Sequence, residues 1–84
     1  LKHNVTHIDS KLLVINCTSS SVDEIQSKVS SLSGKITLRS RSDNNQESEL
    51  VFEILSSGNV VDTKQFEKLN GILKVRTLNY SANN

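Results

Sequence analysis

Apolar residues recur at helical spacing between Ser21 and Gly34, in the stretch SVDEIQSKVSSLSG. Intervals of three, four and three residues place four side chains on one stripe of an α-helix: Val22, Ile25, Val29 and Leu32. Ser21 and Glu24 have the spacing of a capping box at the helix start, and Gly34 suits the left-handed position that closes a helix. Because a helix this short is marginal by itself, we expect its apolar stripe to pack on a sheet.

Four stretches have the patterns of β-strands. Residues 11–17 (KLLVINC) contain four consecutive apolar residues, which predicts a central strand buried on both faces. Residues 35–41, 49–55 and 72–80 alternate between apolar and polar positions, which predicts strands with one wet face. Residues 42–48 contain no apolar side chain and are rich in turn formers, so we expect a flexible hairpin tip there.

A second, shorter helix is predicted before the last strand. Asp62 is a suitable N-cap, and Gln65 occupies the capping-box position three residues later. Phe66 and Leu69 form the apolar stripe of this helix, and the Asn-Gly pair at 70–71 ends it.

The predicted order is strand, helix, strand, strand, helix, strand. Each half is a split βαβ unit, and right-handed crossovers place both helices on the same face of the sheet. The pattern therefore predicts an α+β fold, the ferredoxin-like βαββαβ sandwich, with a four-stranded antiparallel sheet and two helices on one face. The domain spans 11–80, after a lead-in or linker at 1–10 and before a polar tail at 81–84. Its sheet contributes these core residues: Leu13, Ile15, Ile36, Leu38, Leu50, Phe52, Ile54, Leu73 and Val75.

The composition narrows the function only slightly. Eighty-four residues make one domain with a modest core, and a net charge of +1 gives no bulk attraction to nucleic acid or to an anionic membrane. No apolar run approaches the roughly 18 residues of a membrane span. The chain has no Met, so we expect it to be a segment of a longer protein or a processed chain.

The pattern over residues 11–80 resembles an ACT-like regulatory module. The stretches that carry the likeness are LLVINC, VDEIQSKV, ELVFEIL and FEKLNGILKVRTLNY. The chain is also similar to the small soluble domain at the C-terminus of some bacterial membrane proteins, of which the MgtC/SapB family is one group. The resemblance implies a regulatory domain, cytoplasmic or at the cytoplasmic face of a membrane protein. Amino-acid-binding ACT domains usually have a glycine in the turn before the first helix, whereas this chain has Thr18 to Ser21 there, so no family binding residue is transferred.

Residues capable of catalysis or metal binding form no recognisable constellation. His3 and His7 fall in a segment without helical pattern, and Cys17 ends an apolar strand with no His near it in sequence. We expect a buried structural thiol, no metal, no cofactor and no enzyme activity.

The wet face of the predicted sheet suggests an RNA-binding alternative. Five basic residues would share it: Lys35, Arg39, Arg41, Lys74 and Arg76. Ferredoxin-like RNA-binding modules use this face, but with stacking aromatic residues that this chain lacks there. Glu49 and Glu53 would lie among the cations, so cross-strand charge pairing is the plainer interpretation.

Two further surfaces are candidates for binding. Ser19, Ser20 and Ser21, together with the free N–H groups of the helix, could hold a small anion or an amino-acid carboxylate. Val51, Leu55 and Leu78 make the outer face partly apolar and suited to self-association. We therefore expect a non-catalytic accessory or regulatory module of a larger protein, acting by dimerisation or small-ligand sensing. Its partners would be the parent chain, a second copy or a small effector, and single-stranded RNA is the alternative.

Overall fold

The computed structural model describes residues 9–32, 34–56 and 62–80. The elements are β1 (Asp9–Thr18), the 3₁₀ turn η1 (Ser19–Ser21), α1 (Val22–Ser30), β2 (Lys35–Asn44), β3 (Glu47–Ser56), α2 (Lys64–Glu67) and β4 (Ile72–Tyr80). The predicted alternation of strands and helices is confirmed. β1 begins at Asp9, two residues before the predicted start. The predicted lead-in up to residue 8 and the tail at 81–84 lie outside the described residues.

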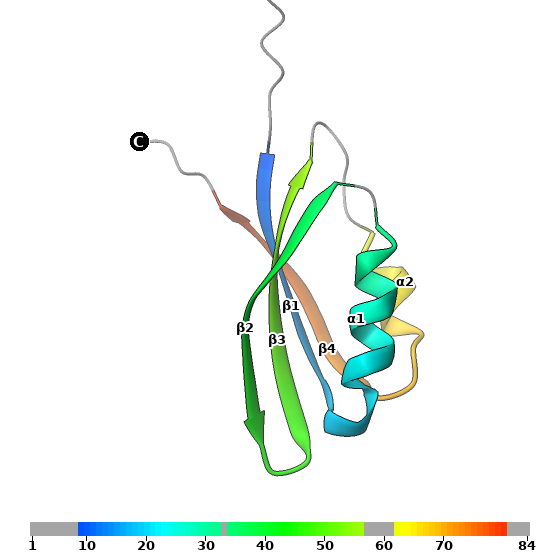
Figure 1. Cartoon of the computed structure of the whole chain (residues 1–84). Helices are drawn as coiled ribbons and strands as arrows, with labels where there is room; N and C mark the ends of the chain where they lie inside the picture. Colours follow the sequence, from blue (N-terminus) through cyan, green and yellow to red (C-terminus); the bar gives the residue numbers. More distant parts are fainter. Residues whose placement is uncertain (1–8, 33, 57–61, 81–84) are drawn as a thin grey trace, which may run out of the picture.

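The four strands form one antiparallel sheet in the order β2-β3-β1-β4. β1 and β3 are therefore the central strands, and β2 and β4 are the edges. Figure 1 shows α1 and α2 on the same side of the sheet. We call this side the helix face and the opposite side the outer face. The protein is an α+β domain with a four-stranded antiparallel sheet and two helices, as the sequence predicts.

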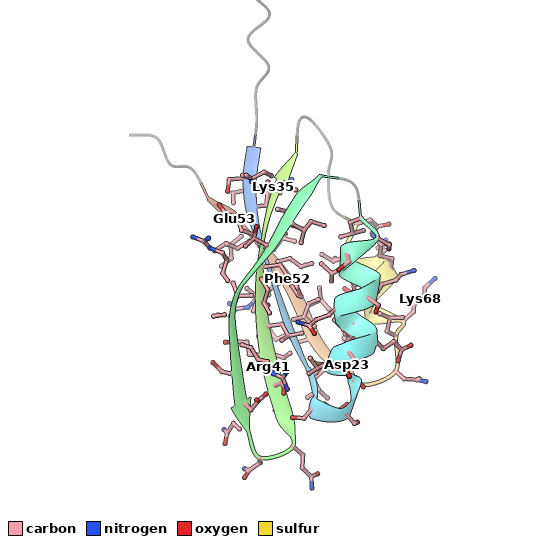
Figure 2. The ribbon with its side chains drawn as sticks, in the orientation of Figure 1. Asp23, Lys35, Arg41, Phe52, Glu53 and Lys68 are labelled. Carbon is pink, nitrogen blue, oxygen red and sulfur yellow. The ribbon has the colours of Figure 1, made fainter. Side chains whose placement is uncertain are left out.

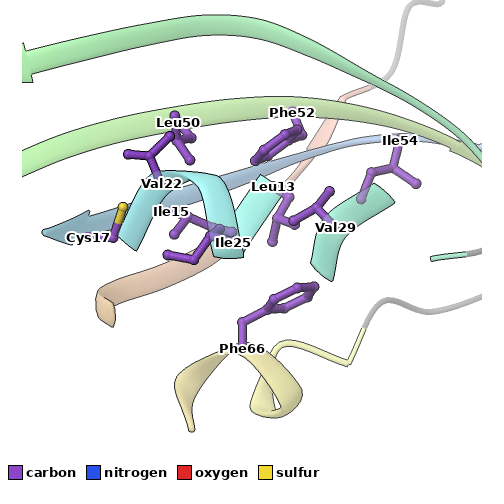
Figure 3. Packing of buried hydrophobic residues seen from close by; sticks show 10 residues of the cluster. All are labelled: Leu13, Ile15, Cys17, Val22, Ile25, Val29, Leu50, Phe52, Ile54 and Phe66. Atoms are coloured by element: carbon purple, nitrogen blue, oxygen red, sulfur yellow. The ribbon is translucent and has the colours of Figure 1, made fainter. Parts of the chain in front are cut away.

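The core lies between the helices and the two central strands (Figure 3). Every second residue of β1 and β3 points into it, because side chains alternate across a strand. α1 contributes three residues of its predicted stripe, and α2 contributes Phe66. The buried cluster consists of Leu13, Ile15, Cys17, Val22, Ile25, Val29, Leu50, Phe52, Ile54 and Phe66. Leu32 and Leu69, the remaining stripe residues, are partly buried against it.

The edge strands contribute less to the core than predicted. Leu38 and Leu73 were expected inside, but their side chains are 39% and 52% exposed. Ile36 and Val75 only pack against the border of the cluster. Both exposed leucines lie at irregularities in the pairing, where a β-bulge breaks the alternation of side chains. The core prediction is therefore wrong for Leu38 and Leu73.

The predicted flexible tip at 42–48 is mostly strand. β2 continues to Asn44 and β3 begins at Glu47, which leaves Asn45 and Gln46 as a two-residue turn. Asn45 has a φ of 60°, a left-handed conformation that Asn adopts more readily than most residues. The hairpin is therefore longer and more regular than its lack of apolar residues suggested.

The helix ends also differ from prediction. Ser21 precedes α1 but makes no side-chain capping hydrogen bond, because its hydroxyl bonds the Thr18 hydroxyl instead. α1 ends with Ser31 as C-cap, so Gly34, with a φ of 103°, lies in the connection to β2 and does not close the helix. The capping box and the glycine closure are thus both wrong.

The start of α2 agrees with prediction only in part. Thr63 is the N-cap, but the Asp62 carboxylate accepts a hydrogen bond from the Lys64 N–H at 3.0 Å. The Gln65 side chain donates to the Asp62 carbonyl at 3.1 Å. The predicted pair is therefore joined, through atoms other than those of a capping box.

Candidate functional site

The serine-rich turn η1 connects β1 to α1, and its hydroxyl groups contact other hydroxyl groups of the chain. The Ser21 and Thr18 hydroxyl oxygens lie 2.8 Å apart, and the Ser20 hydroxyl lies 3.5 Å from that of Thr18. The Ser19 hydroxyl lies 2.8 Å from that of Ser48 on β3. Ser19 and Ser21 of the predicted anion site thus have close partners within the chain, whereas the exposed Ser20 has only the long contact of 3.5 Å.

Ser48 is the centre of a directed network on the helix face. Its side chain is 1% exposed, and its hydroxyl donates to the Asp43 carboxylate at 2.5 Å. A hydroxyl has one hydrogen, so the Ser19 hydroxyl must be the donor to Ser48. Arg41 Nε donates to the same Asp43 oxygen at 3.1 Å. A further bond, from the Ser19 N–H to the Gln46 carbonyl at 2.8 Å, joins the turn to the hairpin tip.

The electrostatics of this network favour a structural role. The hydrogen bonds from Ser48 and from Arg41 hold the pKa of Asp43 below its ordinary value. A carboxylate stabilised in its charged form is a poor base, so it cannot activate the serine hydroxyls beside it. The network therefore joins η1 to the β2–β3 hairpin.

Cys17 lies beside this network and has a free, buried thiol. Its side chain is 0% exposed, as the sequence predicts. Burial raises the pKa of the thiol, Arg41 opposes that shift, and Asp43 adds to it. The group therefore stays protonated at neutral pH and is no nucleophile.

The outer face carries an apolar strip over three adjacent strands. It consists of Leu12 and Val14 from β1, Val51 and Leu55 from β3, and Leu78 from β4. Leu12 pairs with Leu78, and Val14 pairs with Val51, so their side chains are neighbours across the strands. Val14 is 4% exposed, whereas Leu78 is 44% exposed. The three predicted interface residues thus share one face, together with two that prediction did not assign to it.

The signal for these two additional residues was present in the sequence. In the run KLLVINC, Leu12 precedes the core residue Leu13, and Val14 lies between Leu13 and Ile15; both Leu12 and Val14 are apolar. Such a run indicates burial on both faces. Among the residues that the structure describes, helices lie on one face only, so no described helix covers the second apolar face of β1. Leu12 is half-buried there and Val14 is 4% exposed.

The basic residues of the RNA-binding hypothesis do not form one surface. A bulge between Leu38 and Ser40 shifts the alternation of β2, so that Arg41 pairs with Leu50 and lies on the helix face (Figure 2). The predicted outer-face position of Arg41 is therefore wrong. Arg39 forms an ion pair with Glu53 at 3.4 Å.

The other basic residues lie at opposite edges of the sheet. Lys35 belongs to β2, whereas Lys74 and Arg76 belong to β4. β3 and β1 lie between them, and β3 carries Glu49 and Glu53 on the outer face. The acidic β3 therefore divides the basic groups, and a nucleic-acid backbone would meet no continuous positive track.

Other features of the described residues add little to these candidate sites. An open hollow at the hairpin tip is lined by Asn44, Asn45, Gln46 and Glu47, all from one turn. Within residues 9–32, 34–56 and 62–80, no three His, Cys, Asp or Glu side chains come together as a metal site requires. His3 and His7 lie outside this part of the chain. Neither described helix combines the length and the apolar character needed to cross a membrane. No protein-family model and no curated protein matches the chain.

Proposed function

We propose that this chain is a non-catalytic accessory module of a larger protein and that it acts by pairing with a second copy of itself. The observation that carries the proposal is the apolar strip on the outer face. Five apolar side chains lie there on three adjacent strands, and none of the described helices covers them. Leu78 is exposed and Leu12, Val51 and Leu55 are half-buried, so the strip offers apolar surface to a partner.

The fold also supports the proposal that this is an ACT-like module of a larger protein. The order β2-β3-β1-β4 with antiparallel neighbours and two helical connections is compatible with a ferredoxin-like sandwich of the ACT-like kind. We take the parent to be a regulated bacterial protein, with this domain in the cytoplasm or at the cytoplasmic face of its membrane. Pairing would then couple two parent chains, so that any bias in the pairing equilibrium reaches the attached domains.

Small-ligand sensing and RNA binding have weaker support. The serine hydroxyls bond within the chain, and the basic residues are divided by β3. Pairing needs neither group. Among the functions expected from sequence, it is the one that the arrangement of side chains favours.

Sedimentation velocity over a concentration series tests this function. The paired part of the outer face spans about 20 Å across four strands and about 23 Å along seven residues, an outline of roughly 450 Å². This is below the ~800 Å² per partner of a standard interface, so the pairing is expected to be weak and the series must extend to about 500 µM. We expect the weight-average mass to rise from the 9.3-kDa chain mass towards twice that value. A constant monomer mass over the whole series would contradict the proposal.

A further inference from the structure

Charges on the outer face are arranged in stripes on either side of β1. On the β3 side, Glu49 pairs with Asn16 of β1, and Glu53 pairs with Leu12. On the β4 side, Lys74 pairs with Asn16, and Arg76 pairs with Val14. β1 thus carries apolar side chains in its middle. The acidic stripe of β3 runs along one side of it, and the basic stripe of β4 runs along the other.

This arrangement restricts how two outer faces can meet. A two-fold axis parallel to β1 places β1 on the partner's β1 and exchanges the two sides, so the acidic stripe of each copy lies over the basic stripe of the other. An axis in the sheet plane but perpendicular to β1 leaves the sides unexchanged. Acidic β3 would then lie over the partner's acidic β3, and basic β4 over the partner's basic β4. Like charges brought together oppose that second arrangement.

We propose that two copies pair outer face to outer face about an axis parallel to β1, and that Glu49 of each copy meets the partner's Lys74. This inference rests on the proposed function and adds the geometry of the contact. A two-fold rotation about an axis parallel to the strands leaves the position of each residue along the strand direction unchanged. Glu49 and Lys74 are both level with Asn16, so they come opposite each other in the pair. Val14 and Leu12, two and four residues before Asn16, come opposite their own copies, and the half-buried Leu12 supplies more of this apolar contact than Val14, which is 4% exposed.

The existing contacts of the acidic residues favour Glu49 over Glu53 for this role. Glu53 already accepts a hydrogen bond from Ser10 at 3.1 Å and binds Arg39 at 3.4 Å. Glu49 has a longer contact of 3.4 Å with the Asn16 amide, and forms no ion pair among the described residues. Its carboxylate is half-buried on the sheet and available to a cation from a second copy. Lys74 is exposed and likewise forms no ion pair within the described part of the chain.

Charge reversal tests the contact on the intact chain. Glu49→Lys alone places like charges together twice in each dimer, and so does Lys74→Glu alone. Two such contacts are expected to raise the dimer Kd by about 10- to 100-fold at low salt. The double variant carries both reversals in each copy, which restores the two opposite-charge pairs between the copies and should recover most of the affinity. An equimolar mixture of the two single variants should also dimerise, because all four charges are then complementary between chains.

Glu47→Lys is the matched control. Glu47 lies on the same strand and face, but it is level with Thr18, beyond the last β1–β4 pair at Cys17 and Ile72. It therefore has no β4 residue opposite it in the proposed pair, and its reversal should leave the Kd within about two-fold of the parent value. Circular dichroism of each variant shows whether the fold is retained.

The outcomes separate this inference from the proposed function. If the parent chain dimerises but the single reversals behave like Glu47→Lys, the Glu49–Lys74 contact is wrong, and the copies pair in another orientation or through another surface. The same conclusion holds if the folded single variants are weak and neither the double variant nor the mixture recovers. If the parent chain is monomeric throughout, both the inference and the proposed function fail.

Discussion

Gly71 provides a sharp test of how the serine turn packs. It precedes β4 and accepts a hydrogen bond from the Thr18 N–H through its carbonyl at 2.8 Å. A Cβ atom built on Gly71 would lie 1.9 Å from the Ser21 hydroxyl oxygen, 2.7 Å from Ser21 Cβ and 2.6 Å from the Thr18 hydroxyl oxygen. Its φ of 87° lies in the left-handed region that side-chain-bearing residues avoid. Gly71→Ala therefore meets both a backbone and a packing obstacle.

The expected destabilisation is the sum of these two effects. A left-handed conformation costs a residue with a Cβ about 1–2 kcal/mol. Forcing an extra methyl group into a filled space typically adds about 1–3 kcal/mol. The total of about 2–5 kcal/mol is a large part of the roughly 4–13 kcal/mol expected for a domain of this size. Gly71→Ala should therefore shift the urea midpoint far down or leave the chain unfolded.

Urea unfolding followed by circular dichroism measures the effect, with two controls. Gly34→Ala has a φ of 103° on an exposed residue, so it should lose only the backbone contribution of about 1–2 kcal/mol. Ser21→Gly in the Gly71→Ala background removes two of the three close atoms and should recover part of the loss, which a double-mutant cycle isolates. The packing described here is refuted if Gly71→Ala costs no more than Gly34→Ala, or if Ser21→Gly recovers nothing.

Two further predictions concern the titratable groups near the hairpin. The Cys17 thiol is fully buried and its pKa is raised by burial, so a thiol-reactive disulfide reagent at pH 8 should label the folded chain far more slowly than the chain in denaturant; equal rates would show an accessible thiol. The pKa of Asp43 is held below its ordinary value of 3.8, so its contribution to stability is complete above that value and is lost as the pH falls through the lower, folded-state pKa. Asp43→Asn should therefore flatten the fall of the urea midpoint as the pH drops below about 4, and an unchanged acid dependence in the variant would contradict the network around Ser48.

The sequence predicted the elements that bury apolar side chains and was less successful at the edges. The stripe of α1 and the alternating residues of β3 were confirmed because burial leaves a period in the sequence. The bulge at Arg39 could not be recognised, since residues 39–42 alternate Arg and Ser and any of them could be the extra residue. The position of Arg41 on the helix face follows from that bulge alone.

Polar contacts between distant residues account for the other errors. The Ser21 hydroxyl was expected to cap α1, but it has a partner in Thr18 that the capping pattern does not consider. The β2–β3 hairpin extends beyond its last apolar residue because Asp43 bonds Ser48, and Ser48 bonds Ser19. Contacts such as these depend on the tertiary arrangement, and no local pattern in the sequence records them. The outer apolar face, by contrast, was indicated by the unbroken run in β1.

The most direct test of pairing through the outer face is a dilution series of methyl NMR spectra on the intact chain. Pairing moves the methyl signals of residues in the contact and leaves distant ones unchanged. We predict concentration-dependent shifts for Leu12, Val14, Val51 and Leu78, with the methyl signals of Ile25 and Val29 under the helices constant. Spectra that do not change with concentration, or shifts confined to the helix side, would contradict the account.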